Sequence, residues 1–506
     1  MRRRLLVLLL TPAFALSLLA GAPAMSQTPG PQPGSPDYVA RDVTNIAAAY
    51  GRITGPGGQL DNSAYLPALV GQSTQQGVGQ LLQQVATPTR LALTAGNVFP
   101  GWNVGNPLRA GWDGTRGVSR KVSFTNRYGA LLRGTVYRPK DGARDPYTGK
   151  RLRAPYPGVV ITPGSVQGSE GMYVWLAQDL AERGYVVLTY DVQGQGTSES
   201  LPHEPLPGDQ VNALPFCNPF AAPRDGEMLG CPGVPFQQLS NFVVGTEDAI
   251  DFFTSTRTHP YANPGPVGTA VDAHNPFASF FDQRKDRRTA TPGRTLKLAI
   301  IGHSMGAAAV SKVQATDRRV AAVVALDKLQ ASGSFAPGTA AGSNKPVVPA
   351  LAVQSEYGFT VSPYALSGSS SLSPQPSPDG SDRMRERRTG FDDWADAGVD
   401  SMLVVPRAST HLDYTDIPLV LPASRYGQDL TSAYVQRWLD RYLKHRAPVR
   451  ALLAKELTYL EPVGGGRWAP VSLQRDPLLS FYYCSAYALD GRHGRRADGD
   501  ITGVGC

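Results

Sequence analysis

Short apolar runs alternate along the chain with segments whose apolar residues recur at helical spacing. The apolar runs cover residues 158–162, 185–190, 296–301, 320–326, 348–353 and 401–405. The helical segments lie near residues 173–180, 239–253 and 428–445. Short apolar runs are typical of buried strands, and strands that alternate with helices favour a largely parallel sheet covered on both faces. The pattern therefore predicts an α/β fold.

A different pattern precedes the first of these runs. Between residues 118 and 139, apolar positions such as Val122, Phe124, Leu132 and Val136 alternate with polar ones around a turn at residues 126–129. This alternation predicts a β-hairpin at the leading edge of the sheet. Further towards the N-terminus the pattern is ambiguous, and only residues 78–85 suggest a short amphipathic helix among Gly/Pro clusters.

The most informative motif follows the run at residues 296–301. It reads Gly302-His303-Ser304-Met305-Gly306, and small helix-compatible residues come next. A strand that ends in G-x-S-x-G and opens a helix is the context of a nucleophile elbow, in which the glycines allow a sharp turn and the serine oxygen is exposed. A Gly-Ser turn by chance is the alternative. Ser304 is our candidate nucleophile.

A serine hydroxyl needs a base, and the base needs an acid to orient it. In proteins with this elbow the chain order is serine, acid, histidine, which leaves His411, His445 and His493. His411 follows the run at residues 401–405 after a short loop and is therefore expected at the carboxyl edge of the sheet. The other two lie in basic, surface-like surroundings, so we predict His411 as the base. His303, inside the elbow, is expected to pack and to transfer no proton.

Two acids follow strands beyond the nucleophile. Asp327 comes directly after residues 320–326, and Glu356 lies just past residues 348–353. Either carboxylate could reach the histidine, and a cap for the next loop is the alternative role of each. For the oxyanion of a tetrahedral intermediate we expect the backbone amides of Met305 and Ser165, because Pro163 has no N–H.

These segments occur in the order seen in α/β-hydrolases. The matching stretches are residues 159–165, 179–185 and 191–198, GHSMG, Ala325-Leu326-Asp327, Ser355-Glu356-Tyr357 and Ser409-Thr410-His411. Over residues 120–445 the chain looks most like the secreted platelet-activating-factor acetylhydrolases and the cutinase-like polyester hydrolases. In the acetylhydrolases the aspartate of an Ala-Leu-Asp run is the acid, so the resemblance favours Asp327 over Glu356. The chain departs from many relatives at Thr162-Pro163-Gly164, where they carry His-Gly, and no substrate is carried over.

The N-terminus predicts export. Residues 1–4 are basic after Met1, residues 5–20 are almost entirely apolar, and Ala22-Pro23-Ala24 follows. This is the pattern of a secretory signal peptide cleaved after Ala24, and the apolar run is short for the alternative, a membrane span. We expect a signal peptide at 1–24, an N-terminal extension of unassigned function at 25–117, a hydrolase domain at 118–446 and a C-terminal extension at 447–506. Loop or lid insertions are expected at about 202–235 and 257–294.

Composition narrows the possible partners. The chain has 506 residues, 41% of them hydrophobic, and a net charge of +8 that includes the arginines of the signal peptide. No basic stripe with interleaved aromatics predicts nucleic-acid binding. In an exported protein the cysteines are disulfide candidates, and nearest-neighbour pairing joins Cys217 to Cys231 and Cys484 to Cys506. Zinc is the alternative, but C-x-x-C spacing is missing.

Together these features predict a secreted serine hydrolase that cleaves carboxylic esters through an acyl-enzyme, with no cofactor or metal. The substrate could be a small molecule, a lipid or a polymer. A serine peptidase of the same fold and a non-catalytic binding protein are the alternatives.

Overall fold

The structure is a computed structural model. It describes residues 31–55, 58–86, 101–165, 168–199, 239–266, 268–286, 296–331, 345–359, 361–364, 380–417, 425–491 and 494–506. The predicted signal peptide, the Cys217–Cys231 pair, the insertion at 202–235 and His493 lie outside the described residues.

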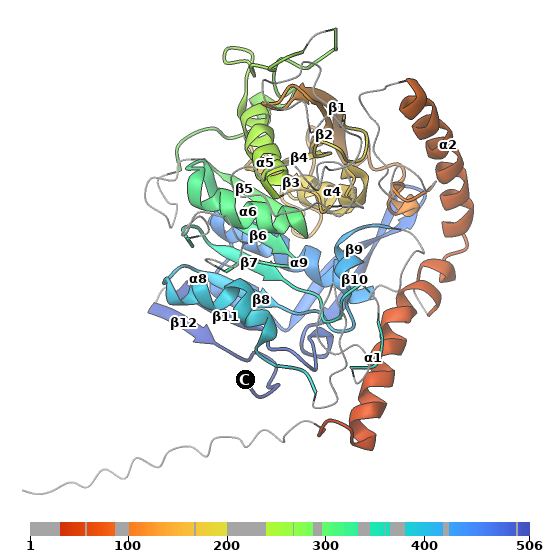
Figure 1. Cartoon of the computed structure of the whole chain (residues 1–506), viewed down its shortest axis with the longest axis vertical. Coiled ribbons are helices and arrows are strands. Elements are labelled where there is room, and N and C mark those ends of the chain that lie inside the picture. Colours follow the sequence, from red (N-terminus) through yellow and green to blue (C-terminus); the bar gives the residue numbers. More distant parts are fainter. Residues whose placement is uncertain are drawn as a thin grey trace, which may run out of the picture.

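A large mixed sheet forms the centre of the described part of the molecule (Figure 1). Its strand order is β1-β2-β4-β3-β5-β6-β7-β8-β11-β12. The strands are β1 Gly117–Thr125, β2 Leu131–Pro139, β3 Gly158–Thr162, β4 Val186–Tyr190, β5 Leu298–His303, β6 Val320–Leu326, β7 Ala350–Val353, β8 Ser401–Val404, β11 Ala486–Gly491 and β12 Gly494–Asp498. Neighbours from β4 to β8 are parallel, whereas β1, β2, β11 and β12 pair antiparallel.

Helices cover both faces of this sheet. They are α4 Val174–Glu182, α5 Leu239–Thr254, α6 Met305–Thr316, α8 Asp392–Asp396 and α9 Arg425–Tyr442. One apolar cluster joins the strands to α5, α6 and α8, and a second joins them to α4 and α9. Every residue of β3 to β8 is buried, which explains why these strands are apolar without alternation.

These observations confirm the predicted α/β fold with a mostly parallel sheet. The sharp turn after β5 lies at the carboxyl edge of the parallel part of this sheet. The predicted hairpin at the leading edge is also present as β1 and β2, whose residues pair from Gly117 with Pro139 to Thr125 with Leu131.

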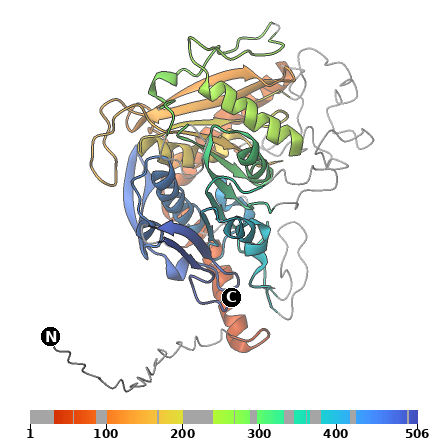
Figure 2. The same ribbon diagram turned by 90° about the vertical axis from the view of Figure 1, so that its left-hand side faces the viewer.

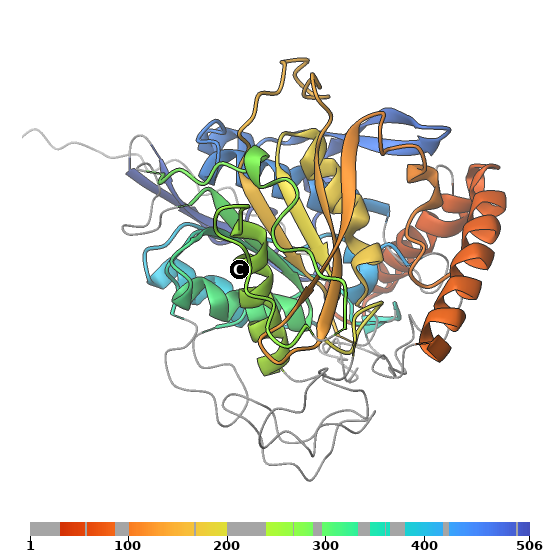
Figure 3. The same ribbon diagram turned by 90° about the horizontal axis from the view of Figure 1, so that it is seen from above.

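The N-terminal part forms two long helices that lie along one side of the molecule (Figures 1 and 3). The elements here are α1 Pro36–Thr54, η1 Gln59–Asp61, α2 Tyr65–Ala86 and η3 Pro107–Arg109. Helix α1 begins after Ser35, whose side chain accepts a hydrogen bond from the Tyr38 amide. The helix suggested for residues 78–85 is the end of the much longer α2, and no sequence pattern indicated α1.

Helix α1 has an unusual distribution of side chains. Its buried positions hold Tyr38, Asp42, Asn45 and Ala49, and its exposed positions include Val39, Val43 and Tyr50. The inward face therefore carries an acid and an amide, and the outward face carries apolar groups. Tyr38 and Ala49 join the main apolar cluster, and the partly buried Ile46 and Ala48 pack against it. Helix α1 therefore contacts the rest of the protein through apolar packing as well as through these hydrogen-bonding groups.

The segment after residue 446 contributes to the same body. It contains α10 Val449–Leu452, β9 Glu456–Gly464, β10 Arg467–Gln474 and η9 Asp476–Leu478 before β11 and β12. The β9–β10 hairpin packs beside α9, and β11 pairs with β8. Figure 2 shows these blue C-terminal elements on one side and the green helices α5 and α6 on the other.

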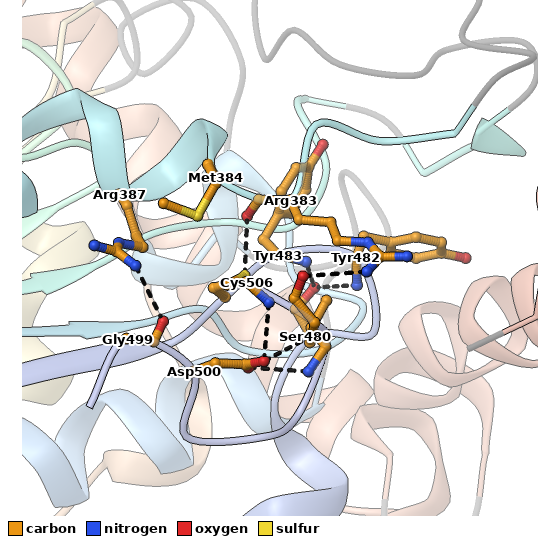
Figure 4. The surroundings of a disulfide bond; sticks show 12 residues. Arg383, Met384, Arg387, Ser480, Tyr482, Tyr483, Gly499, Asp500 and Cys506 are labelled. Atoms are coloured by element: carbon orange, nitrogen blue, oxygen red, sulfur yellow. Dashed lines mark hydrogen bonds between the residues drawn. A yellow bond between two sulfur atoms is a disulfide. The ribbon is translucent and has the colours of Figure 1, made fainter. Parts of the chain in front are cut away.

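A disulfide joins Cys484 to Cys506, as predicted, and the two Cα atoms are 6.3 Å apart. Figure 4 shows that the bond lies beside Ser480, Tyr482 and Tyr483. Asp500 accepts the amide hydrogens of Gly505 and Cys506 at 2.7 and 3.1 Å. This carboxylate therefore closes a turn around the disulfide.

One part of the described insertion at 257–294 lies along the edge strand β1, and another pairs with Tyr156 just before β3. The Tyr261 hydroxyl donates to the carbonyl of Thr125 at 2.8 Å, and the Ser123 amide donates to Asp272 at 2.9 Å. Within the described ranges, no helix combines the length and apolar character that crossing a bilayer requires.

Candidate active site

Ser304 lies at the sharp turn between β5 and α6. It has a left-handed backbone with a φ of 55°, and unlike the buried His303 it is partly exposed. A Cβ added to Gly302 would lie 2.1 Å from the carbonyl oxygen of Gly306, and one added to Gly306 would lie 2.4 Å from that of Pro163. Both positions therefore need glycine, and the turn holds the serine at the carboxyl end of β5.

His411 and Asp327 meet at the same edge of the sheet. Asp327 directly follows β6, and His411 begins the short 3₁₀ helix η8 His411–Tyr414 after β8. His411 Nδ1 lies 2.6 Å from Asp327 Oδ2. The Ser355 hydroxyl and amide also donate to this carboxylate, at 2.8 and 3.1 Å. The side chain of Asp327 is thus fixed by three donors.

The surroundings of Asp327 keep its carboxylate ionised. Burial alone would raise its pKa, but the hydrogen bond and charge of His411, with smaller effects from Lys328 and Ser355, outweigh burial and hold the pKa well below its usual range. An ionised acid beside Nδ1 favours a histidine whose other nitrogen, Nε2, can accept a proton.

The other acid weighed from the sequence, Glu356, has different partners. Its carboxylate is buried and accepts hydrogen bonds from the Ser480 hydroxyl at 2.6 Å, the Phe481 amide at 3.3 Å, the Ala408 amide at 2.5 Å and the Asn45 side chain. Burial raises the pKa of Glu356 although these donors oppose the shift. Within the described ranges, none of these hydrogen bonds involves the imidazole of His411. The bond from Ala408 instead joins Glu356 to the loop before His411.

His303 takes part in a chain of hydrogen bonds behind the elbow. The Gly164 amide donates to the Tyr173 hydroxyl at 2.9 Å, that hydroxyl lies 2.7 Å from His303 Nδ1, and His303 Nε2 lies 2.8 Å from the carbonyl of His411. A carbonyl can only accept, so Nε2 carries the hydrogen and Nδ1 accepts from Tyr173. Burial, helped by the nearby His411, lowers the pKa of His303 to about 3. A neutral His303 is therefore consistent with both of its hydrogen bonds, to Tyr173 and to the carbonyl of His411.

The loop after β3 lies against the elbow. A Cβ added to Gly164 would be 3.0 Å from the Cβ of Ser304. The Gly164 amide is already bonded to Tyr173, and its carbonyl accepts from Gln195 at 2.9 Å. The next amide along this loop is that of Ser165. On the other side, Met305 occupies the first position of α6, where an amide has no intrahelical acceptor.

Several residues at this site carried no clear signal in the sequence. Tyr173 looked like one apolar position of a helix, and Gln195 lay in a glycine-rich stretch. Ser355 stood next to a recognised acid, but nothing indicated that it would contact Asp327. The Phe359 ring, whose centroid is 4.6 Å from that of His411, also carried no signal in the sequence.

His445, one of the alternative histidines, lies just beyond α9. Its Nε2 is 2.6 Å from an Asp286 carboxylate oxygen.

Two known proteins resemble parts of this chain. No family model matches the chain. An uncharacterized protein of Pseudomonas aeruginosa is 33% identical over 129 residues. The match covers 24% of this chain and about a third (32%) of that protein. A ferulic acid esterase from Streptomyces cinnamoneus resembles 65% of this chain and 90% of its own, with 17% identity and a TM-score of 0.36. That likeness is too distant to support an inference about the site.

Proposed function

We propose that this protein is a serine hydrolase that cleaves carboxylic esters. The observation that carries the proposal is the His411–Asp327 hydrogen bond at the sheet edge where the elbow presents Ser304. Along the chain, the nucleophile would follow β5, the acid would follow β6 and the base would follow β8. This is the order expected for this fold. In this proposal Asp327 is the acid and Glu356 has a supporting role.

The proposed reaction has two halves. His411 Nε2 takes the hydroxyl proton while Ser304 Oγ attacks the acyl carbon, and the tetrahedral intermediate collapses as the same nitrogen protonates the leaving alkoxide. A water molecule then attacks the acyl-enzyme, His411 takes its proton, and that proton returns to Ser304 as the acid product leaves. Asp327 remains ionised throughout and stabilises the imidazolium.

The oxyanion would be bound by two backbone amides. We assign these to Met305, at the positive end of the α6 dipole, and to Ser165 in the loop after β3. Support comes from the neighbouring groups, because Pro163 has no N–H and the Gly164 amide is bonded to Tyr173. Export also remains part of the proposal, and the Cys484–Cys506 disulfide suits an oxidising compartment.

The proposal is tested by the hydrolysis of short p-nitrophenyl esters. In Ser304→Ala, kcat should fall by about a thousandfold or more, because the nucleophile is lost. Ser311→Ala is a matched control, since it removes a buried hydroxyl from the same helix, where Ser311 bonds to the Ala307 carbonyl. The control should keep near-normal activity. Full activity in Ser304→Ala would refute the assignment.

A substrate panel distinguishes this proposal from a peptidase of the same fold. Short and long esters, phospholipid, polyester film and aminoacyl amides should be compared with the mature protein. Ester hydrolysis without measurable amide hydrolysis supports the proposal, whereas efficient cleavage of the aminoacyl amides would favour a peptidase.

A further inference from the structure

The N-terminal helix α1 contacts the segment that follows β7. Asn45 donates to the Glu356 carboxylate and, at 3.1 Å, to the Tyr357 hydroxyl. One turn earlier, Asp42 accepts from the hydroxyls of Tyr357 and Tyr482 at 3.2 and 2.8 Å and from the Tyr364 amide at 2.8 Å. Asp42 and Asn45 are both at most 5% exposed. These polar contacts explain why the inward face of α1 carries an acid and an amide.

Glu356 connects this contact to the loop before His411. The same carboxylate oxygen that accepts from Asn45 also accepts from the Ala408 amide at 2.5 Å. Ala408 has a φ of 56°, a conformation that a residue with a side chain adopts at a cost. The bond to Glu356 therefore stabilises a strained backbone three residues before the proposed base.

Backbone contacts extend the connection to His411 itself. The Glu356 amide donates to the Ser409 hydroxyl at 3.1 Å, and the Tyr357 amide donates to the Ser409 carbonyl at 2.9 Å. The His411 amide donates to the carbonyl of Gly358 at 2.9 Å. The loop before the base is thus held along its length by the residues from Glu356 to Gly358.

The four donors to the Glu356 carboxylate come from three distant parts of the chain. Ser480 and Phe481 precede the disulfide, Ala408 belongs to the histidine loop, and Asn45 belongs to α1. A buried carboxylate that loses one donor is left with uncompensated desolvation, and its remaining bonds rearrange. Removing Asn45 should therefore change the position of the Ala408 amide.

We propose that Asn45 and Glu356 are positioning residues for His411, so that the N-terminal helix supports the active site. The inference rests on the proposed function and adds to it a role for residues 36–54. Neither side chain takes part in proton transfer. They act by holding the loop that places the imidazole between Asp327 and Ser304.

The test is the kinetics of Asn45→Ala in the full chain with a short p-nitrophenyl ester. We expect kcat to fall by about tenfold and KM to change by less than about twofold, because a misplaced base slows chemistry rather than binding. The matched control is Tyr442→Phe, which removes a buried hydroxyl bonded to Asp400 at the opposite end of β8. Its kcat should stay within about twofold of normal at a similar loss of thermal stability.

The outcomes separate this inference from a general effect on folding. A kcat for Asn45→Ala that matches the control, or a change confined to KM, would overturn the positioning role. If Asn45→Ala does not fold, Glu356→Gln replaces it, because that change keeps the size of the side chain and alters the group that joins Asn45 to the Ala408 amide. A reduced kcat there supports the inference, and a normal kcat contradicts it. Full activity in Ser304→Ala would instead refute the proposed function.

Discussion

Asp327 and Glu356 illustrate how two similar carboxylates acquire different environments. Each follows a buried strand, and the sequence alone left both as possible acids. In the structure Asp327 meets an imidazole and two donors from Ser355, which keep its pKa low. Glu356 meets four donors without an imidazole among them, and burial raises its pKa. The difference depends on long-range contacts that no local pattern encodes.

The two acids should therefore respond differently to amide substitution. Asp327→Asn should lower kcat by about a thousandfold or more, because the amide cannot stabilise the imidazolium or maintain its tautomer. Glu356→Gln should lower kcat by about tenfold, through displacement of the loop before His411. Steady-state kinetics on one ester compares them directly. A larger loss in Glu356→Gln would reverse the proposed assignment of the acid.

His303 should make the stability of the protein dependent on pH. Its pKa is about 3 in the folded state, whereas an unfolded histidine titrates near about 6.5. Between these values the native state binds fewer protons than the unfolded state, so the free energy of unfolding falls as the pH falls. This loss begins near the unfolded pKa and is complete at about the folded pKa.

Urea unfolding between pH 7 and pH 4 measures this contribution. His303→Gln removes the titrating group, so its unfolding free energy should depend less steeply on pH over this window than that of the unsubstituted protein. Parallel curves for the two proteins would show that His303 does not carry the effect.

At the scale of elements, the elbow combines a strand, a turn and a helix that approach one another closely. Gly306→Ala places a Cβ against the carbonyl oxygens of Pro163 and Thr162, at 2.4 and 2.5 Å. We expect a loss of about 1–3 kcal/mol in unfolding free energy, with reduced activity, because β3 and α6 must separate. Chemical unfolding and ester hydrolysis measure the two effects.

Gly245→Ala in α5 is the control for this prediction. The nearest atom to its added Cβ, the Tyr190 hydroxyl oxygen, is 3.6 Å away, an ordinary contact. An alanine there should be neutral or should stabilise the helix by up to about 1 kcal/mol. Equal destabilisation by both substitutions would contradict the close approach at the elbow.

The strands of the central sheet were predictable because burial on both faces makes them continuous apolar runs. Residues 158–162 and 320–326 match β3 and β6 at both ends. Helix α1 was not predictable, since its inward face contains Asp42 and Asn45 while Val39 and Val43 are exposed. Its apolar residues lie on both the inward and the outward face, and part of its contact with the fold consists of hydrogen bonds, which apolar spacing does not reveal. The strands after residue 446 were also not identified from the sequence.

At the scale of the whole molecule, both ends of the described chain meet around one buried carboxylate. Asn45 reaches Glu356 from the N-terminal helix, and Ser480 reaches it from the segment beside the Cys484–Cys506 disulfide. Asn45 and Ser480 are separated by most of the amino-acid sequence. The nucleophile, base and acid candidates could be named from local motifs and strand ends, whereas this supporting network could not.

The central claim is that folding makes Ser304 a nucleophile. Labelling of the native protein with a fluorophosphonate, followed by peptide mass spectrometry, tests it most directly. We predict modification of Ser304, loss of labelling after denaturation, and much slower labelling in Asp327→Asn. Labelling at another residue, or no labelling of the folded protein, would contradict the claim.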